Sequence, residues 1–204
     1  IASGGNFNTV VGDEAGTAIT TGDGNSFFGK GAGALTVGTS YNVGIGDGAL
    51  GANVATGNTA VGSAAMTSTT SGSKNVAIGL EAGRFLTTGS NSVFVGYESG
   101  KGIDGTKLTG GDNVAVGYRI SALYSQNNTG SASMFNTAVG SGAGFSVSTG
   151  THSTYIGGNA GYFNTTADNS TFVGFKAGYG VDGTPCTGNG NTAIGKDAGL
   201  LLQG

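Results

Sequence analysis

The sequence predicts an all-β protein, a parallel β-solenoid or β-roll of about eleven short coils with two strands in each coil. The first observation is a period: a glycine that follows an apolar residue recurs at intervals of 16 or 17 residues, except where a longer insert intervenes. These marker glycines are Gly12, Gly29, Gly46, Gly62, Gly79, Gly96, Gly117, Gly140, Gly157, Gly174 and Gly195. The second observation is composition. The chain has 44 glycines among 204 residues, but valine, isoleucine and phenylalanine recur at fixed places, which distinguishes it from disordered glycine-rich chains.

The third observation is a strand motif, Asn-x-x-apolar-Gly, that ends at each marker glycine. Its fourth position is β-branched or aromatic in every coil: Val11, Phe28, Ile45, Val61, Ile78, Val95, Val116, Val139, Ile156, Val173 and Ile194. Side chains alternate along a strand, so the second position shares that face: Thr9, Ser26, Val43, Thr59, Val76, Val93, Val114, Thr137, Thr154, Thr171 and Thr192. We expect these two columns to face inward as the ladder of the core. The third position then faces outward, and it reads Val10, Phe27, Gly44, Ala60, Ala77, Phe94, Ala115, Ala138, Tyr155, Phe172 and Ala193.

Two glycine-containing corners are expected in each coil. Two variable residues and then Ala-Gly follow most marker glycines, as at Ala82-Gly83, and a weaker second segment ends in Thr-Gly or Ser-Gly, as at Thr88-Gly89. Glycine permits the positive φ and close backbone approach that a tight corner needs. The second segment would supply the second strand of the coil, and no helix is expected. The whole chain, 1–204, should form one solenoid domain, a rod about 50 Å long at the ~4.8 Å spacing of paired strands.

Three inserts interrupt the period, near 101–112, 121–135 and 179–190. The first and third are visibly the same loop, Gly-Ile-Asp-Gly-Thr against Gly-Val-Asp-Gly-Thr, which indicates that a block of several coils was duplicated. Extra residues in a solenoid bulge out at a corner, where recognition tends to occur.

The strand pattern resembles the β-roll head repeats of trimeric autotransporter adhesins, which carry an Asn-Ser-x-Ala-Ile-Gly strand. It is equally similar to the Asn-Thr-Ala-Ile-Gly repeats of phage tail fibres. The resemblance covers the chain from Asn8 to Gly199, although the adhesin repeat is shorter and the sequence lacks the anchor, stalk or chaperone domain that would separate the families. It implies left-handed coils in a homotrimeric, extracellular, non-catalytic fibre segment of a cell surface or a virion.

Charge and composition argue against several partners. The net charge is −3 and no basic run occurs, so nucleic acid is not expected to bind. No apolar run approaches the ~20 residues of a membrane helix, so membrane insertion is not expected. Residues 1–3 lack the charged and apolar regions of a signal peptide, so we expect either that a segment outside this sequence directs export or that the sequence is a fragment of a longer chain. The single cysteine, Cys186, excludes an intrachain disulfide.

The polar residues that could form a site also have structural interpretations. The strand asparagines Asn8, Asn25, Asn42, Asn58, Asn75, Asn113, Asn136 and Asn191 could bind a ligand in a row, but a ladder of amides that closes a corner is the preferred interpretation. Threonine is abundant, and a flat outward row of threonines can order water, as in ice-binding solenoids. The strand threonines are expected on the inward face, which argues against that function.

No catalytic, cofactor-binding or metal-binding residue is expected. The aspartates do not recur at one position, unlike those of calcium-binding β-rolls, and the paired loop residues Asp104 and Asp182 are expected to form Asp-Gly turns rather than an ion site. His152 is the single histidine and gives little support for a zinc site or a catalytic triad. Glu14, Glu81 and Glu98 occupy corner positions and are expected to be solvated rather than to hydrolyse sugars. Asn127, Asn164 and Asn169 match the glycosylation motif, which is common by chance in this composition.

These observations predict a structural and adhesive fibre segment that is not an enzyme, with an unidentified glycan or protein receptor. The alternatives are a solenoid that binds or cleaves polysaccharide, an ice-binding protein, and a filament subunit that stacks end to end. The third-position column, taken as outward, would join three chains into a homotrimer. Val139→Asp would then place a carboxylate in the core and destabilise the fold.

Overall fold

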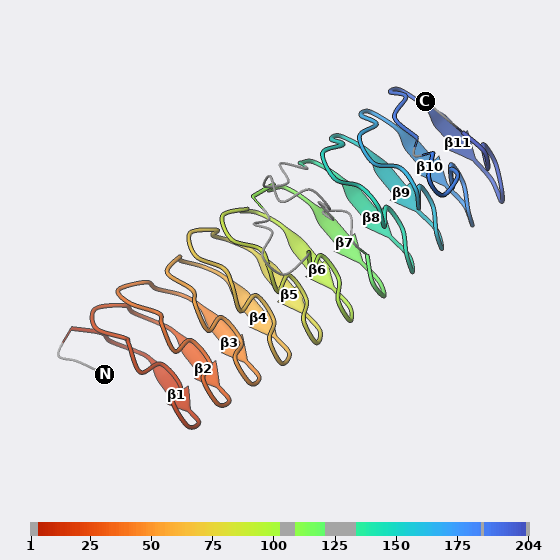
Figure 1. Ribbon diagram of the computed structural model, residues 1–204. Helices are drawn as coiled ribbons and strands as arrows, with labels where there is room; N and C mark the ends of the chain where they lie inside the picture. Colours follow the sequence, from red (N-terminus) through yellow and green to blue (C-terminus); the bar gives the residue numbers. More distant parts are fainter. Residues whose placement is uncertain (1–3, 103–108, 121–133, 185, 203–204) are drawn as a thin grey trace.

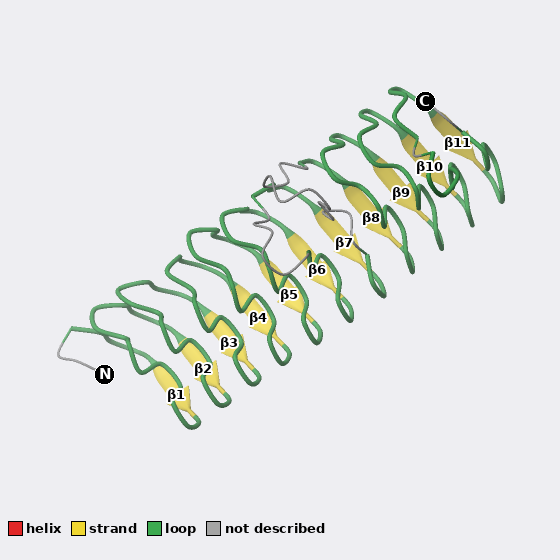
Figure 2. Cartoon of the chain, viewed as in Figure 1, coloured by secondary structure: helices red, strands yellow, loops and turns green. Residues whose placement is uncertain are grey.

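The computed structural model describes residues 4–102, 109–120, 134–184 and 186–202. It is a parallel β-solenoid of about ten turns, and no helix occurs among these residues (Figures 1 and 2). One sheet of eleven strands runs along the rod in sequence order. The strands are β1 (Thr9–Val11), β2 (Ser26–Phe28), β3 (Val43–Ile45), β4 (Thr59–Val61), β5 (Val76–Ile78), β6 (Val93–Val95), β7 (Val114–Val116), β8 (Thr137–Val139), β9 (Thr154–Ile156), β10 (Thr171–Val173) and β11 (Thr192–Ile194).

Every strand pairs in parallel with the next at equivalent positions of the motif, so Val76 lies opposite Val93 and Ile78 opposite Val95. The marker glycine follows each strand and has a φ that side chains rarely adopt. At Gly79 φ is +135°, and an added Cβ would lie 2.4 Å from the carbonyl oxygen of Gly96 in the next coil. The period of the glycines therefore reflects backbone packed directly on backbone at this corner.

The expectation of two strands per coil is wrong for the described residues. Each coil has one three-residue strand, and the second segment is a series of turns. Backbone hydrogen bonds between coils still hold these turns together, as from Phe85 N–H to the carbonyl of Lys101 (3.0 Å) and from Ser68 N–H to Arg84 (3.0 Å). The turns satisfy their backbone groups without forming a second ladder.

The inside-outside assignment of the strand is also wrong. Ala77 and Phe94, at the third position, are fully buried, whereas Ile78, at the fourth, is 43% exposed. The third column therefore lines the core, and the second and fourth columns face outward. In β5, for example, Val76 is half-buried, Ala77 is buried and Ile78 is exposed. Val139 is an outward residue, 36% exposed, so Val139→Asp would not place a carboxylate in the core.

The interior of the coil is thin. In six coils, two core positions that lie six residues apart hold one large and one small residue. An aromatic third position is followed by glycine, as in the pairs Phe27 and Gly33, Phe94 and Gly100, Tyr155 and Gly161, and Phe172 and Gly178. A Cβ on Gly100 would lie only 2.2 Å from Cδ1 of Phe94. A small third position is followed in two coils by a large buried residue: Leu50 follows Gly44, and Met66 follows Ala60. In these six coils one of the two positions is therefore large and the other small.

The inserts are only partly described. Residues 103–108 and most of 121–135 lie outside the described residues. The insert near 179–190 is described except for residue 185, and it contains an antiparallel bridge between Val181 and Thr184. Its Asp182 is exposed, beside Gly183, whose φ is +78°.

Candidate functional site

The most extensive candidate site is the outward side of the sheet, which we call the outer sheet face. It consists of the second and fourth strand positions of β1 to β11. All members of the fourth column are valine, isoleucine or phenylalanine, and the second column contains only threonine, serine and valine. No charged residue occurs in either column. Among the exposed members of the fourth column, the exposed fraction of the residue ranges from 36% at Val139 to 69% at Ile194.

The geometry of this face follows from the parallel register. Equivalent residues of consecutive strands are direct partners, so each column runs straight along the sheet. The strands are three residues long, so the face is about 50 Å by 10 Å, or about 500 Å², at ordinary strand spacings. The fourth column is apolar along this whole length, whereas seven of the eleven second-column residues are threonine or serine. A continuous exposed apolar stripe of this kind is typical of a contact surface.

A buried ladder of side chains closes the corner that precedes each strand. Asn75 is representative: its Oδ1 accepts a hydrogen bond from Ser92 N–H (2.9 Å), and its Nδ2 donates to the Gly89 carbonyl of its own coil (2.9 Å). The same position is occupied by Asn25, Asn42, Asn58, Asn113 and Asn136, and by serine at Ser92, Ser153 and Ser170, all of them buried. The interpretation of the asparagines as a corner-closing ladder is confirmed, since their hydrogen bonds are made within the protein.

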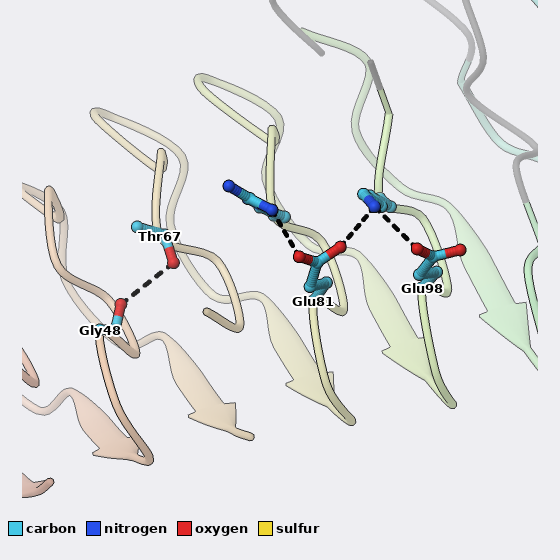
Figure 3. A network of polar contacts seen from close by, with 6 residues as sticks. Gly48, Thr67, Glu81 and Glu98 are labelled. Atoms are coloured by element: carbon cyan, nitrogen blue, oxygen red, sulfur yellow. Dashed lines mark hydrogen bonds and ion pairs between the residues drawn. The ribbon is translucent and has the colours of Figure 1, made fainter. Parts of the chain in front are cut away.

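The opposite corner, after the strands, carries charged side chains on three successive coils. Glu81 contacts Arg84 and Lys101, and Lys101 also contacts Glu98 at 2.7 Å (Figure 3). Arg119 Nε then approaches Glu98 at 3.0 Å. One coil earlier, the Thr67 hydroxyl donates to the Gly48 carbonyl across the same corner (3.1 Å), as Figure 3 also shows. The expectation that Glu81 and Glu98 are merely solvated is wrong, because each is shared by two cations.

This network shifts the pKa of Glu98, Lys101 and Arg119. Burial alone would raise the pKa of Glu98, but the hydrogen bond and charge of Lys101, the hydrogen bond of Tyr97 and the charge of Arg119 together hold it below the usual value. Burial would lower the pKa of Lys101, but its contacts with Glu81 and Glu98 raise it. The charge of Glu98 raises the pKa of Arg119. For Glu98, Lys101 and Arg119 the shifts favour the charged form, as expected when opposite charges lie close together.

Aromatic rings continue this corner toward the C-terminus. Tyr162 stacks between Phe145 (ring centroids 4.7 Å apart) and Tyr179 (5.4 Å). Phe163 meets both tyrosines edge to face. Burial raises the pKa of Tyr162, which therefore remains a neutral phenol at neutral pH.

The other predicted site residues do not converge. His152 is exposed and stacks on Phe135 with centroids 4.9 Å apart. Asp104 and Asn127 lie outside the described residues, whereas Glu14 and Asn169 are exposed. Asn164 is fully buried and donates to the Tyr155 hydroxyl at 3.0 Å, so its acceptor motif is not accessible for glycosylation in the folded chain.

Further groups with possible chemistry are separated from one another. Cys186 is a buried free thiol, and burial raises its pKa. Burial likewise raises the pKa of the Tyr155 phenol. Among the residues that the structure describes, no three His, Cys, Asp or Glu side chains are placed to hold a metal ion. The same residues include no helix that could cross a membrane.

The sequence alone identified neither the outer sheet face nor the ion network as a surface feature. The outer sheet face was assigned to the core because alternation does not reveal which side is inward. The ion network joins residues one coil apart, such as Glu81 and Lys101, and becomes apparent only when the coils are aligned in space. Comparison with protein-family models, with curated proteins and with solved structures gave no match.

Proposed function

We propose that this chain is a non-catalytic structural and adhesive segment of an extracellular fibre, whose working unit is a homotrimer joined through the outer sheet face. The observation that carries the proposal is the fourth column of the outer sheet face, which is apolar in all eleven paired strands and contains no charged residue. The repeat type is that of adhesin β-roll heads and phage tail fibres, which the strand motif resembles. The left-handed coil that this resemblance implies stays a prediction.

A second and third copy of the chain are the partners that suit this face best. A partner must be apolar, straight and at least as long as the rod, and another copy has all three properties at the same spacing. The flat area of about 500 Å² becomes larger when side-chain relief is included, and a standard interface buries about 800 Å² on each partner. Closed cyclic symmetry would cover the face completely and prevent open-ended association. The third-position column, which was expected to form this contact, lies inside the coil. We therefore place the contact between chains on the outer sheet face, on the opposite side of the strand.

The mass of the protein in solution tests the assembly. We expect light scattering coupled to size exclusion to give about three times the 19.7 kDa of the chain. Ile78→Lys, in the centre of the outer sheet face, should reduce the mass, because it places a charge in an apolar contact. Leu80→Lys is the matched control, since Leu80 is similarly exposed (46%, against 43% for Ile78) but lies after the marker glycine. A wild-type monomer would contradict the proposal.

The non-catalytic part has a separate test. The alternative of a polysaccharide-cleaving solenoid requires an acid and a base that act on one bond. We expect no turnover of bacterial or plant polysaccharides by the protein. A hydrolysis that is lost when a single Asp, Glu or His is changed would contradict this part and leave the assembly intact.

A second function, ice binding, is favoured by one observation. The strand threonines face outward, contrary to expectation, and four consecutive strands carry one: Thr137, Thr154, Thr171 and Thr192. Their hydroxyls and methyl groups form a straight row at the ~4.8 Å strand spacing, next to the valines and isoleucines of the fourth column. Ice binding needs this face uncovered, so the two functions exclude each other on one molecule. Thermal hysteresis by a monomer, lost in Thr154→Lys, would replace the fibre by this function; the fibre predicts none.

A further inference from the structure

A separate surface lies on the corner after strands β7 to β10, and we call it the corner saddle. It consists of Tyr118, Arg119, Ser141, Gly158, Phe175 and Lys176. Backbone hydrogen bonds show that these residues occupy consecutive coils. Gly142 N–H donates to the Tyr118 carbonyl (3.1 Å), Asn159 N–H to Ser141 (2.8 Å) and Lys176 N–H to Gly158 (2.9 Å).

Each end of the saddle has an exposed aromatic ring followed by a cation. Tyr118 is 52% exposed and Phe175 is 49% exposed. The Arg119 guanidinium lies 6.0 Å from the centroid of the Tyr118 ring. Lys176 Nζ lies 5.5 Å from the centroid of Phe175 and 5.2 Å from that of Tyr179. The rings hold the cations at the surface, where both groups can meet a ligand.

The middle of the saddle is low because its two coils carry small residues. Ser141 and Gly158 occupy the positions that Tyr118 and Phe175 occupy at the ends. The ring of Phe175 leans over Gly158, where an added Cβ would lie 3.4 Å from the ring. Three strand spacings separate the two aromatic residues, which is about 14 Å. A ligand of a few residues could therefore contact both ends and approach the backbone between them.

Between the coils of β5 and β10 this corner carries more cations than carboxylates: Arg84, Lys101, Arg119 and Lys176 against Glu81 and Glu98. Each of the two carboxylates contacts two of the first three cations. Lys176 has no ion pair among the described residues. The neighbouring Asp197 pairs with Lys196 at 3.7 Å. At the saddle, therefore, Arg119 shares Glu98 with Lys101, and Lys176 is the cation without an ion pair in the described part of the chain.

We infer that the corner saddle binds an acidic oligosaccharide, such as a chain of uronic acids. The C–H faces of sugar rings pack on exposed aromatic rings, and carboxylates pair with guanidinium and ammonium groups. The low middle admits the chain of the sugar. This inference rests on the proposed adhesive function and names its ligand class and its site. The site shares no residue with the outer sheet face and lies just beyond it, after the marker glycines Gly117 and Gly174.

Binding of a defined probe tests the inference. The probes are an oligogalacturonate, its carboxyl-reduced neutral form and a poly-glutamate peptide, measured by titration calorimetry at low and high salt. We expect the oligogalacturonate to bind, and its affinity to fall with salt. Phe175→Ala and the double variant Arg119→Gln/Lys176→Gln should each reduce affinity by about tenfold or more, the scale of one aromatic or charge-assisted contact. Lys74→Gln, at an exposed cation on the corner that precedes the strands, should stay within about twofold.

Each other outcome has a defined meaning. Equal binding of the neutral form would overturn the role of the cations, and equal binding of poly-glutamate would overturn the saccharide in favour of an acidic peptide. No binding by a wild-type protein of trimeric mass would overturn the saddle and leave the fibre standing. Binding by a monomer would support the saddle and contradict the trimer. Circular dichroism of each variant checks that the coil is intact, and an intact Phe175→Ala variant with wild-type affinity would overturn the site.

Discussion

Asn75 offers a stringent test of what holds the coils together. The residue is fully buried, and Asn75→Ala removes the acceptor for Ser92 N–H and the donor to the Gly89 carbonyl. It also removes a longer bond from Nδ2 to Asn58 Oδ1 (3.2 Å), but that oxygen still accepts from the Asn75 backbone N–H. A buried polar group that loses its partner costs about 1–3 kcal/mol. The two groups together should therefore reduce the free energy of unfolding by about 4 kcal/mol. This is a large fraction of the 5–15 kcal/mol that is typical of a domain.

The chain itself supplies the matched variant. Serine occupies the ladder position in three coils, and Ser153 Oγ accepts from Ser170 N–H at 3.1 Å. Asn75→Ser should keep the acceptor for Ser92 N–H and lose the amide donor to the Gly89 carbonyl and to Asn58 Oδ1. About half of the lost stability should therefore be recovered relative to Asn75→Ala. Asn6→Ala is the surface control, because Asn6 is exposed and its side chain makes only a 3.4 Å bond to the Gly4 carbonyl. That change should stay within about 0.5 kcal/mol.

Urea unfolding followed by circular dichroism gives the free energies. A solenoid can unfold coil by coil, so hydrogen exchange should be measured as well, and protection should be lost first in the coils around β5 and β6. If Asn75→Ala and Asn75→Ser both unfold like the wild type, the ladder does not contribute as argued. If Asn6→Ala is as destabilised as Asn75→Ala, the loss cannot be assigned to burial.

Three further changes test the interior and the ion network. In dilute protein, Ala138→Asp should lower the melting temperature far more than Val139→Asp, because Ala138 is fully buried and Val139 is 36% exposed. Equal decreases in melting temperature would contradict the assignment of the third column to the core and the fourth to the surface. Gly100→Ala should reduce the free energy of unfolding by at least about 2 kcal/mol, since φ at Gly100 is +60° and the new Cβ would meet the ring of Phe94. In a double-mutant cycle, adding Phe94→Leu to the same chain should recover part of that stability. The lowered pKa of Glu98 means that its stabilising effect is present above its ordinary pKa of 4.5 and is lost as the pH falls through the lower folded value. The difference in melting temperature between wild type and Glu98→Gln should therefore shrink below pH 4.5, and a constant difference down to pH 3 would show that charge is not its cause.

The architecture could be predicted from the sequence because a period is a property of the chain alone. Gly79 and its counterparts recur since each packs on the next coil, so their spacing equals the length of a coil. The prediction that the core contains the fourth column failed for a different reason. Alternation separates two sets of residues but does not identify the inward set, and both sets here are apolar. Hydrophobicity favoured Val and Ile, whereas the thin interior requires small or volume-matched residues.

A signal for the correct side is nevertheless present in the sequence. Residues of the third column vary in size from Gly44 to Phe94, and large members are followed six residues later by glycine. Compensation of this kind is expected inside a core, where total volume is fixed, and not on a surface. The fourth column shows no such coupling. The corner network was beyond sequence reasoning, because Glu81 and Lys101 lie in different coils and their contact depends on which way two long side chains turn.

The length of each surface separates its role in assembly from a role in recognition. In a solenoid, a residue type kept at one position of every coil forms a stripe along the whole rod, and the outer sheet face is such a stripe from β1 to β11. A partner that contacts it over its full length must repeat at the strand spacing, which another copy does. The aromatic and cationic corner extends over only some of the coils, between Glu81 and Lys176. A local stripe cannot specify the register of a long partner, but it can bind a short ligand. The outer sheet face therefore suits association along the rod, and the neighbouring corner suits recognition of a short ligand.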